Sequence, residues 1–286
     1  MLMKLIELSV SGLALGSIYA LLALAMTVIW ATTDVIDVSI GGQATLAGVI
    51  AASLSVPLGF LVGAAAGIAT GVLMGVVFAA FHARGLLRDP MPVVLATFGA
   101  LIIAESAILT AAGTQGMHLA AAPGIIFVGE AVMTVQSLVN IGVAGGVYLA
   151  LAALLKWSPL GLTMRACAVS DKAARLVGIP VRQTQFFTFV LGGLVAGIGG
   201  LLAAMTAGLS YSSPFNLTIA GLSGALLFGR KTPTAAFGGG LVIGIAETLG
   251  GGYLPEGWSA ATSSLVILLV LATSRLPATA FSGGRP

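Results

Sequence analysis

Long apolar stretches separated by short polar segments run along almost the whole chain. Stretches of membrane-span length lie near 8–30, 38–55, 59–81, 93–112, 135–155, 184–207, 215–229, 234–250 and 259–274. A transmembrane helix needs about 20 consecutive, mainly apolar residues, so the pattern predicts an all-α, polytopic membrane bundle of eight or nine spans. The first stretch is longer than the roughly 7–15 apolar residues of a signal peptide, so we interpret it as the first span.

Composition supports this interpretation and excludes a soluble domain. Hydrophobic residues make up 58% of the 286 residues and charged residues 7%, whereas soluble domains carry about 25% charged residues. We therefore expect a single transmembrane domain over residues 1–286. Cys167 is the only cysteine, which excludes an intrachain disulfide and gives no Cys/His metal centre; we interpret it as a small loop residue.

Basic residues gather on one side of the predicted bundle. If the spans alternate in direction, loops 83–92, 156–183 and 230–233 and the C-terminal tail share a side, and the opposite loops carry no Lys or Arg. The shared side holds 11 of the 12 basic residues, which are Arg84, Arg88, Lys156, Arg165, Lys172, Arg175, Arg182, Arg230, Lys231, Arg275 and Arg285. The positive-inside rule makes this side cytoplasmic, with the C-terminus inside and the N-terminus outside.

Two of the predicted spans are interrupted. Segment 31–37 carries no basic residue, only Asp34 and Asp37, so we expect it to break the helices within the membrane. The pattern Gly-Leu-x-x-Gly at 12–16 recurs at 193–197 in the opposite orientation, and a polar interruption and a short span follow each copy. Paired broken spans are typical of transporters with an inverted repeat and a site at the membrane midplane.

Glycines recur at every fourth position of the third predicted span. They are Gly59, Gly63, Gly67, Gly71 and Gly75. A stripe of small residues lets two helix backbones approach closely in lipid, so it predicts tight helix packing rather than a ligand site.

Two acids, Glu105 and Glu247, fall inside predicted spans. An ionisable group in the membrane is costly and is by default a hypothesis of function, whereas the alternative is a protonated or hydrogen-bonded packing residue. Both readings stay open, because neither acid has an evident basic partner. No Ser-His-Asp order, HExxH motif or catalytic carboxylate pair occurs, so we expect neither an enzyme nor a metal site.

The loop 157–182 is the most informative polar segment. Its stretch 171–179 is charged and rich in alanine, and it closes with Gly178 and Ile179. This pattern predicts a short interfacial helix that ends at a glycine. Such a helix could dock into a groove of another protein, or serve only as a solvated connector.

Several motifs follow one another in a characteristic order. They are Gly12-x-x-x-Gly16-Ser17-Ile18-Tyr19-Ala20-Leu21, Thr97-Phe98-Gly99, Arg165-Ala-x-Ala168 with Ala174-x-Leu176-x-Gly178-Ile179, and Gly244-Ile-Ala-Glu247-Thr-Leu with Tyr253-Leu254-Pro255. Together they resemble permease subunits of bacterial ABC importers of the branched-chain amino-acid (LivH-like) type. Two segments differ from that family: 36–41 looks more like the ribose and galactose permeases, and 230–235 replaces a glycine-rich loop.

The resemblance implies a permease that forms half of a translocation pathway in the bacterial inner membrane. Its implied partners are a second, identical or paralogous permease, two cytoplasmic ATPase subunits and an extracytoplasmic substrate-binding protein, with no nucleic acid. The chain would need no cofactor of its own, because the ATPases bind ATP and Mg. The resemblance assigns the ATPase-coupling contact to Arg165, Ala168, Asp171, Lys172, Ala174, Leu176, Gly178 and Ile179.

The pathway itself is expected beside the two broken spans, where helix ends offer polar backbone groups to a ligand. The candidate residues are Asp37, Ser39, Gln43, Ser212 and Asn216. Branched-chain or other amino acids are the expected substrates, and sugars or small amides are the alternatives. A passive channel for a small neutral solute such as urea, or a structural membrane subunit, are the competing classes of function.

Overall fold

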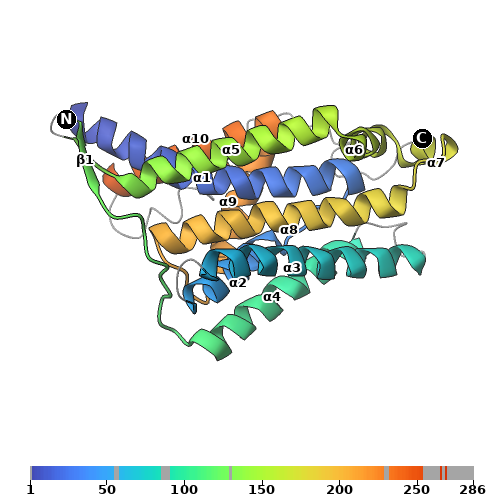
Figure 1. The fold of residues 1–286 in the computed structure, drawn as a ribbon, viewed down its shortest axis with the longest axis horizontal. Coiled ribbons are helices and arrows are strands. Elements are labelled where there is room, and N and C mark those ends of the chain that lie inside the picture. The colour runs from blue at the N-terminus through green and yellow to red at the C-terminus, as the bar shows by residue number, and fades with distance from the viewer. Residues whose placement is uncertain are drawn as a thin grey trace.

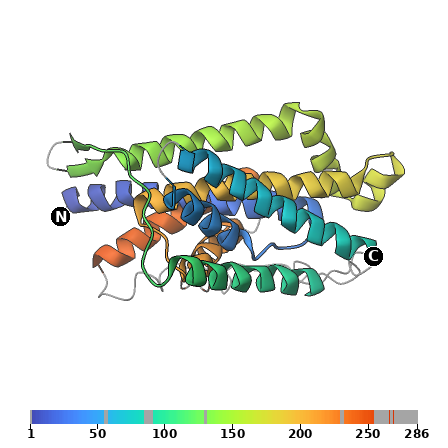
Figure 2. The same ribbon diagram turned by 60° about the horizontal axis from the view of Figure 1, so that its bottom comes forward.

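The computed structural model describes residues 2–54, 58–84, 91–128, 131–228, 232–253, 265 and 268. Its elements are α1 (Leu2–Thr33), α2 (Ile40–Ala52), α3 (Leu58–Ala83), α4 (Met91–Ala112), β1 (Ile125–Val128), β2 (Ala131–Thr134), α5 (Val135–Trp157), α6 (Pro159–Val169), α7 (Asp171–Leu176), α8 (Val181–Thr206), α9 (Ser213–Leu226) and α10 (Pro233–Tyr253). The long helices lie side by side along one axis (Figures 1 and 2). The β1–β2 hairpin and the N-terminus mark one end of the bundle, called the hairpin end here, and α6 and α7 mark the α6–α7 end (Figure 1).

The described helices confirm an all-α membrane protein. Six of them, α1, α3, α4, α5, α8 and α10, are long and apolar enough to cross a membrane. The other two predicted spans contain the short helices α2 and α9, as expected for broken spans. Of the ninth predicted span, 259–274, the structure describes only residues 265 and 268, both of them helical. The hairpin, which pairs Ile125 with Thr134 and Val128 with Ala131, lies between the predicted spans 93–112 and 135–155, where a loop was expected.

Helices α1 and α8 form the centre of the bundle. Ile18, Leu21 and Ile29 of α1 and Phe189 of α8 are almost fully buried. The outer helices α3, α4 and α5 instead leave large apolar side chains exposed along one face. Lipid solvates such faces as well as a protein interior does, so the bundle is held by close packing and not by hiding apolar surface from water.

Two helix crossings depend on glycine. In each, a Gly-x-x-x-Gly pair on one helix meets another on its neighbour, and an added Cβ would strike backbone atoms across the interface. The first crossing, between α1 and α10, uses Gly12, Gly16, Gly240 and Gly244, and the second, between α3 and α8, uses Gly67, Gly71, Gly193 and Gly197. The glycine stripe of the third span is therefore a packing surface, as predicted.

The breaks in the two short spans lie next to each other. After α1 the chain turns at Asp34, which has a positive φ of 57°, and α2 begins only at Ile40. The start of α2 packs directly against α9, because a Cβ on Gly41 would collide with Pro214 and Thr218. In Figure 1, α9 runs across the long axis of the bundle between α2 and α10. The starts of α2 and α9 thereby pack against each other.

Charge is distributed unevenly between the two ends. Described basic residues at the α6–α7 end are Arg84, Lys156, Arg165, Lys172, Arg175 and Arg182. Lys4 belongs to α1 at the hairpin end. Arg88, Arg230, Lys231, Arg275 and Arg285 lie outside the described residues.

Candidate functional site

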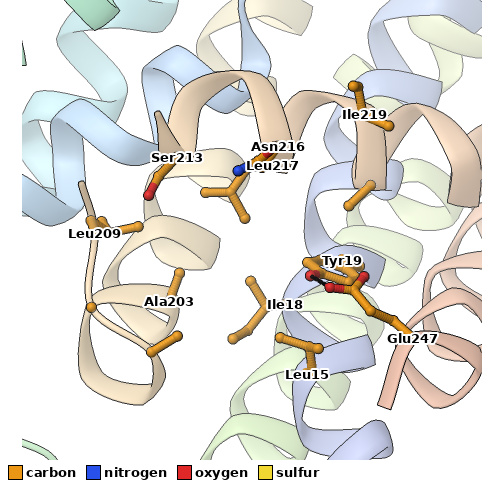
Figure 3. A pocket seen from close by; sticks show the side chains of 13 residues that line it. Leu15, Ile18, Tyr19, Ala203, Leu209, Ser213, Asn216, Leu217, Ile219 and Glu247 are labelled. Carbon is orange, nitrogen blue, oxygen red and sulfur yellow. Dashed lines mark hydrogen bonds between the residues drawn. The ribbon is translucent and has the colours of Figure 1, made fainter. Parts of the chain in front are cut away.

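A cavity of about 220 Å³ lies between α1, α8, α9 and α10 (Figure 3). Its lining includes Ala203 and Ala207, at the end of α8 that lies toward the hairpin end of the bundle (Figure 1). Its wall is mainly apolar, with polar side chains in two places. The lining residues are Leu15, Ile18, Tyr19, Ala203, Ala207, Gly208, Leu209, Ser213, Asn216, Leu217, Ile219, Ala220 and Glu247. An apolar cavity with a few convergent polar groups is the usual form of a small-molecule site.

Tyr19 and Glu247 are the first polar group in the cavity wall. The Tyr19 hydroxyl donates to Glu247 Oε1 at 3.1 Å, and Tyr19 itself is buried. Glu247 Oε2 is buried and has no hydrogen-bond partner within the described part of the chain. The glycine crossing of α1 and α10 brings the two side chains together, since Gly240 packs against the backbone of Tyr19 and Ala20.

The second polar group belongs to the first turn of α9. Ser212 occupies the N-cap and Pro214 follows inside the first turn, where the fixed φ of proline suits a helix start. Ser210 N–H donates to Ser213 Oγ at 2.9 Å, and the Ser210 and Ser212 hydroxyls are 3.1 Å apart. Asn216 is exposed and lines the cavity, with its amide turned toward the space between α9 and α1 (Figure 3).

The segment before the hairpin covers the end of α8 beside the cavity. Met117 and Leu209 exchange two backbone hydrogen bonds, both of 2.8 Å, and Leu119 N–H donates to Ala204 O at 3.1 Å. The His118 ring packs against Gly208, which has a φ of +76°. A residue with a Cβ would fit poorly here for both reasons, so Gly208 holds the turn that forms one wall of the cavity.

Asp37, Ser39 and Gln43 form a separate, fully buried cluster. Asp37 Oδ1 accepts from Ser39 N at 2.8 Å and from Ser39 Oγ at 2.6 Å, and Gln43 Nε2 donates to Asp37 Oδ2 at 3.1 Å. Thr218 of α9 ties the cluster to the second break: it accepts from Gly41 N–H and donates to Val38 O, both at 3.1 Å. The cluster thus connects the starts of α2 and α9.

The structure therefore divides the five predicted pathway residues. Asp37, Ser39 and Gln43 lie together, while Asn216 lines the cavity and Ser212 begins the helix that carries it. The three residues of the buried cluster are absent from the cavity lining.

Glu105 and Glu247, the two intramembrane acids, have different surroundings. Glu247 lines the cavity, whereas Glu105 is half-exposed on α4 beside a shallow groove that includes Ser106 and Thr110. The inner face of α4, including Thr97 and Leu101, packs on the bundle. Glu247 therefore shares a cavity with the polar side chains of Ser213 and Asn216.

The α6–α7 end presents an apolar surface that is open in the isolated chain. Leu176 is 90% exposed, Val177 78% and Val169 77%. Among the predicted coupling residues, Arg165, Ala168 and Lys172 are also exposed, while Ala174 packs inward with Cys167 and Val181. Large apolar side chains exposed at a water-facing end are characteristic of a protein contact.

The two helices of this end have well-defined caps. Ser158 caps α6 and Ser170 caps α7 through side-chain bonds to Gly161 N–H and Ala173 N–H. Gly178 has a φ of +83°, and Ile179 N–H reaches back to Ala174 O at 3.0 Å, which is the Schellman pattern. The predicted short helix with a terminal glycine is confirmed, although the loop holds two helices. Cys167 is buried within α6, so its interpretation as a loop residue was wrong.

Asp171 connects α7 to the membrane helices. Gln185 of α8 donates through Nε2 to Asp171 Oδ2 at 3.0 Å and to Thr32 O at 3.3 Å. Burial raises the pKa of the Asp171 carboxyl, while the Gln185 hydrogen bond and the Arg175 charge act in the opposite direction. Arg175 in turn lies 3.2 Å from His82 Nε2, at the end of α3. The ends of α1, α3 and α8 are therefore linked to α7.

Sequence reasoning missed Tyr19 as a site residue. Tyr19 was named only as part of the motif in the first span, because a single tyrosine within an apolar stretch does not by itself indicate a binding site. The combination of a buried hydroxyl and an intramembrane acid could have suggested the pair, because each needs a hydrogen-bond partner in lipid. Which residue contacts Glu247 depends on how α1 and α10 cross. Tyr19 and Glu247 are 228 positions apart in the chain, so no local pattern pairs them.

Comparison with known proteins yields a family match across almost the whole chain. The model of a family described as the permease component of branched-chain amino acid transport systems matches residues 8–273. LivH, a permease protein of the high-affinity branched-chain amino acid transport system of Escherichia coli (strain K12), is 34% identical over 126 residues. That match covers 43% of this chain and 40% of LivH, so the matched region spans less than half the length of this relative.

Two further relatives extend the comparison. BraD, a permease protein of the high-affinity branched-chain amino acid transport system of Pseudomonas aeruginosa, is 25% identical over 281 residues, which cover 92% of this chain and 91% of BraD. NupQ, a guanosine ABC transporter permease protein of Bacillus subtilis (strain 168), is 33% identical over 104 residues, which cover 34% of this chain and 32% of NupQ.

Proposed function

Because the chain belongs to the family of permease components of branched-chain amino acid transport systems, we propose that it forms half of the translocation pathway of an ABC importer for branched-chain or other amino acids. The chain is a multi-pass membrane subunit of the transport class and not an enzyme. Its proposed partners are a second permease, two ATPases that bind ATP and Mg, and an extracytoplasmic binding protein.

The proposed orientation places the α6–α7 end in the cytoplasm. The described basic residues at that end, among them Arg165, Lys172 and Arg175, support it, since cytoplasmic loops are enriched in Lys and Arg. The cavity would then open toward the outside, where a binding protein delivers solute. With the span proposed at 259–274, the bundle would have nine spans, two of them broken, and a cytoplasmic C-terminus.

We propose further that the two halves of the bundle form an inverted repeat. Helices α1, α2 and α3 would correspond to α8, α9 and α10, because α1 pairs with α10 through glycines as α8 pairs with α3. The short helices α2 and α9, which correspond to each other in this repeat, are in contact through Gly41 and Thr218. This arrangement supports a pathway beside the two broken spans, as transporters with paired broken helices have.

The observation that carries the proposal is the exposed apolar surface of Val169, Leu176 and Val177 on capped helices at the basic end. ATPase movement transmitted to α7 would reach α1, α3 and α8 through Asp171, Gln185 and Arg175. A ligand-driven or ATP-driven change of this kind needs contacts that differ between two states.

The test is co-purification of the full tagged chain from its native membrane, followed by ATP-dependent uptake in proteoliposomes. We expect an ATPase in the complex, and we expect Leu176→Glu to reduce its recovery about tenfold or more, because it puts a charge into an apolar contact. Leu176→Met is the matched control and should retain the complex. A chain that purifies alone and conducts solute without ATP would refute the proposal in favour of a passive channel.

A further inference from the structure

We propose that the cavity between Tyr19, Glu247 and Asn216 is a binding site for a small zwitterion carrying an ammonium group and an aliphatic side chain, with Glu247 as the ammonium ligand. This inference rests on the proposed function and assigns the substrate contact to residues outside the predicted pathway cluster. It follows from the polarity, size and unsatisfied groups of the cavity.

Glu247 has one carboxylate oxygen that is free to accept a hydrogen bond from a ligand, as far as the described residues show. The Tyr19 hydroxyl donates a hydrogen bond to Glu247 Oε1, whereas Glu247 Oε2 is buried without a hydrogen-bond partner among the described residues. Among the described residues, the cavity lining contains no Lys, Arg or His. A carboxylate in low-dielectric surroundings gains most from a cationic hydrogen-bond donor, and an ammonium group supplies both the charge and the proton that this site lacks.

The opposite polar group suits the other end of a zwitterion. Asn216 makes no side-chain hydrogen bond within the described residues, and its amide can donate to a carboxylate. Figure 3 shows Asn216 and Ser213 on α9, across the cavity from the Tyr19–Glu247 pair. An acceptor group and a donor group on facing walls match the two charges of an amino acid and orient it.

The wall between these groups determines the kind of side chain. Leu15, Ile18 and Leu217 are aliphatic and lie along the cavity. The volume of about 220 Å³ is below the roughly 300–1,000 Å³ typical of drug-sized ligands. A small solute with an aliphatic group fits this space, whereas a sugar or nucleoside would offer no cation to Glu247 and would bury hydroxyl groups against leucine.

The experiment measures protection of the cavity from chemical labelling in the complete transporter in proteoliposomes. A Leu15→Cys variant in a Cys167→Ala background is treated with a membrane-impermeant thiosulfonate. We expect L-leucine to slow labelling about tenfold or more, 4-methylpentanoate, which lacks the ammonium, to have no effect, and 3-methylbutylamine to retain part of the protection.

The critical variant is Glu247→Gln, which keeps the shape of the side chain and its bond to Tyr19. It should abolish protection by L-leucine and reduce leucine uptake about tenfold or more, while the amount of purified complex and its melting temperature stay unchanged. Glu105→Gln, the other intramembrane acid, is the matched control and should leave both readouts within about twofold. Asn216→Ala should weaken protection by L-leucine more than protection by the amine.

The outcomes separate this inference from the function on which it rests. If the wild-type complex takes up leucine but Glu247→Gln retains full protection, Glu247 is a packing residue and the inference is wrong while the function stands. Protection by ribose or guanosine instead of leucine, independent of Glu247, would also overturn the inference. If no ATPase co-purifies and no amino acid is taken up, the proposed function itself fails.

Discussion

Replacing Gly193 by alanine tests the claim that the bundle is held by glycine-mediated backbone contacts. An added Cβ on Gly193 would lie 2.5 Å from Gly67 O, 2.6 Å from Gly71 Cα and 2.8 Å from Gly71 N. Ordinary contacts begin at 3.4 Å, so α3 and α8 must separate by about 0.9 Å, the difference between 3.4 and 2.5 Å. The obstacles are backbone atoms, and no side chain can rotate to make room.

The expected cost follows from this geometry. Overpacking a tight core costs roughly 1–3 kcal/mol, and backbone obstacles belong at the upper end, while alanine recovers about 1 kcal/mol of helix propensity. A net loss of about 2 kcal/mol results. The matched control is Gly146→Ala on α5, where an added Cβ meets nothing within 4 Å, and it should gain up to about 1 kcal/mol.

The assay is thermal unfolding of the purified chain in detergent. A difference of about 3 kcal/mol between the two variants corresponds to roughly 6–12 °C in Tm, at 2–4 °C per kcal/mol for chains of this size class. Equal melting temperatures for Gly193→Ala and Gly146→Ala would refute the reasoning, because they would mean that α3 and α8 do not meet through Gly193.

Two further predictions concern the α6–α7 end. Gly178→Ala forces a side chain into a left-handed conformation (φ +83°), at a cost of about 1–2 kcal/mol. This variant should lower the recovery of the ATPase, and Gly178→Asn should lower it less. Equal recovery with the wild type, Gly178→Ala and Gly178→Asn would contradict the role of the cap. The raised pKa of Asp171, caused mainly by burial, means that the folded state binds this proton more tightly, so this group's contribution to stability is full below the ordinary aspartate pKa of about 4 and is lost as pH rises through the folded pKa. Melting curves above pH 4 should show that loss in the wild type and a smaller one in Asp171→Asn; identical pH profiles would contradict the assignment.

Much of the fold could be predicted from local pattern. The run of apolar stretches predicts the six long helices, because span length and apolarity are properties of consecutive residues. The breaks before α2 and α9 were also predictable. The first was indicated by Asp34 and Asp37 in a segment without basic residues, and the second by the shortness of the predicted span 215–229. The terminal glycine of α7 was found for the same reason, since Gly178 and Ile179 lie next to the helix that they end.

The site was predictable only in part. Asn216 lines the cavity from near the start of the broken helix α9, and the pattern identified that break. Asp37 looked equivalent in sequence, yet it lies in a buried cluster where Ser39 and Gln43 satisfy it. A polar residue next to a break can turn toward a cavity or toward its own neighbours, and single-sequence reasoning has no means to tell these apart.

The sequence by itself determined the class of structure, the two broken spans, the basic end and the glycine that ends α7, because each depends on residues within about one helical turn or one span. Tertiary structure alone decided that Tyr19 meets Glu247 and that Asn216 faces them across a cavity. Those contacts join α1, α9 and α10 through glycine crossings whose register no local pattern records. In lipid, where apolar faces gain little from meeting one another, the fit of backbone against backbone selects that register.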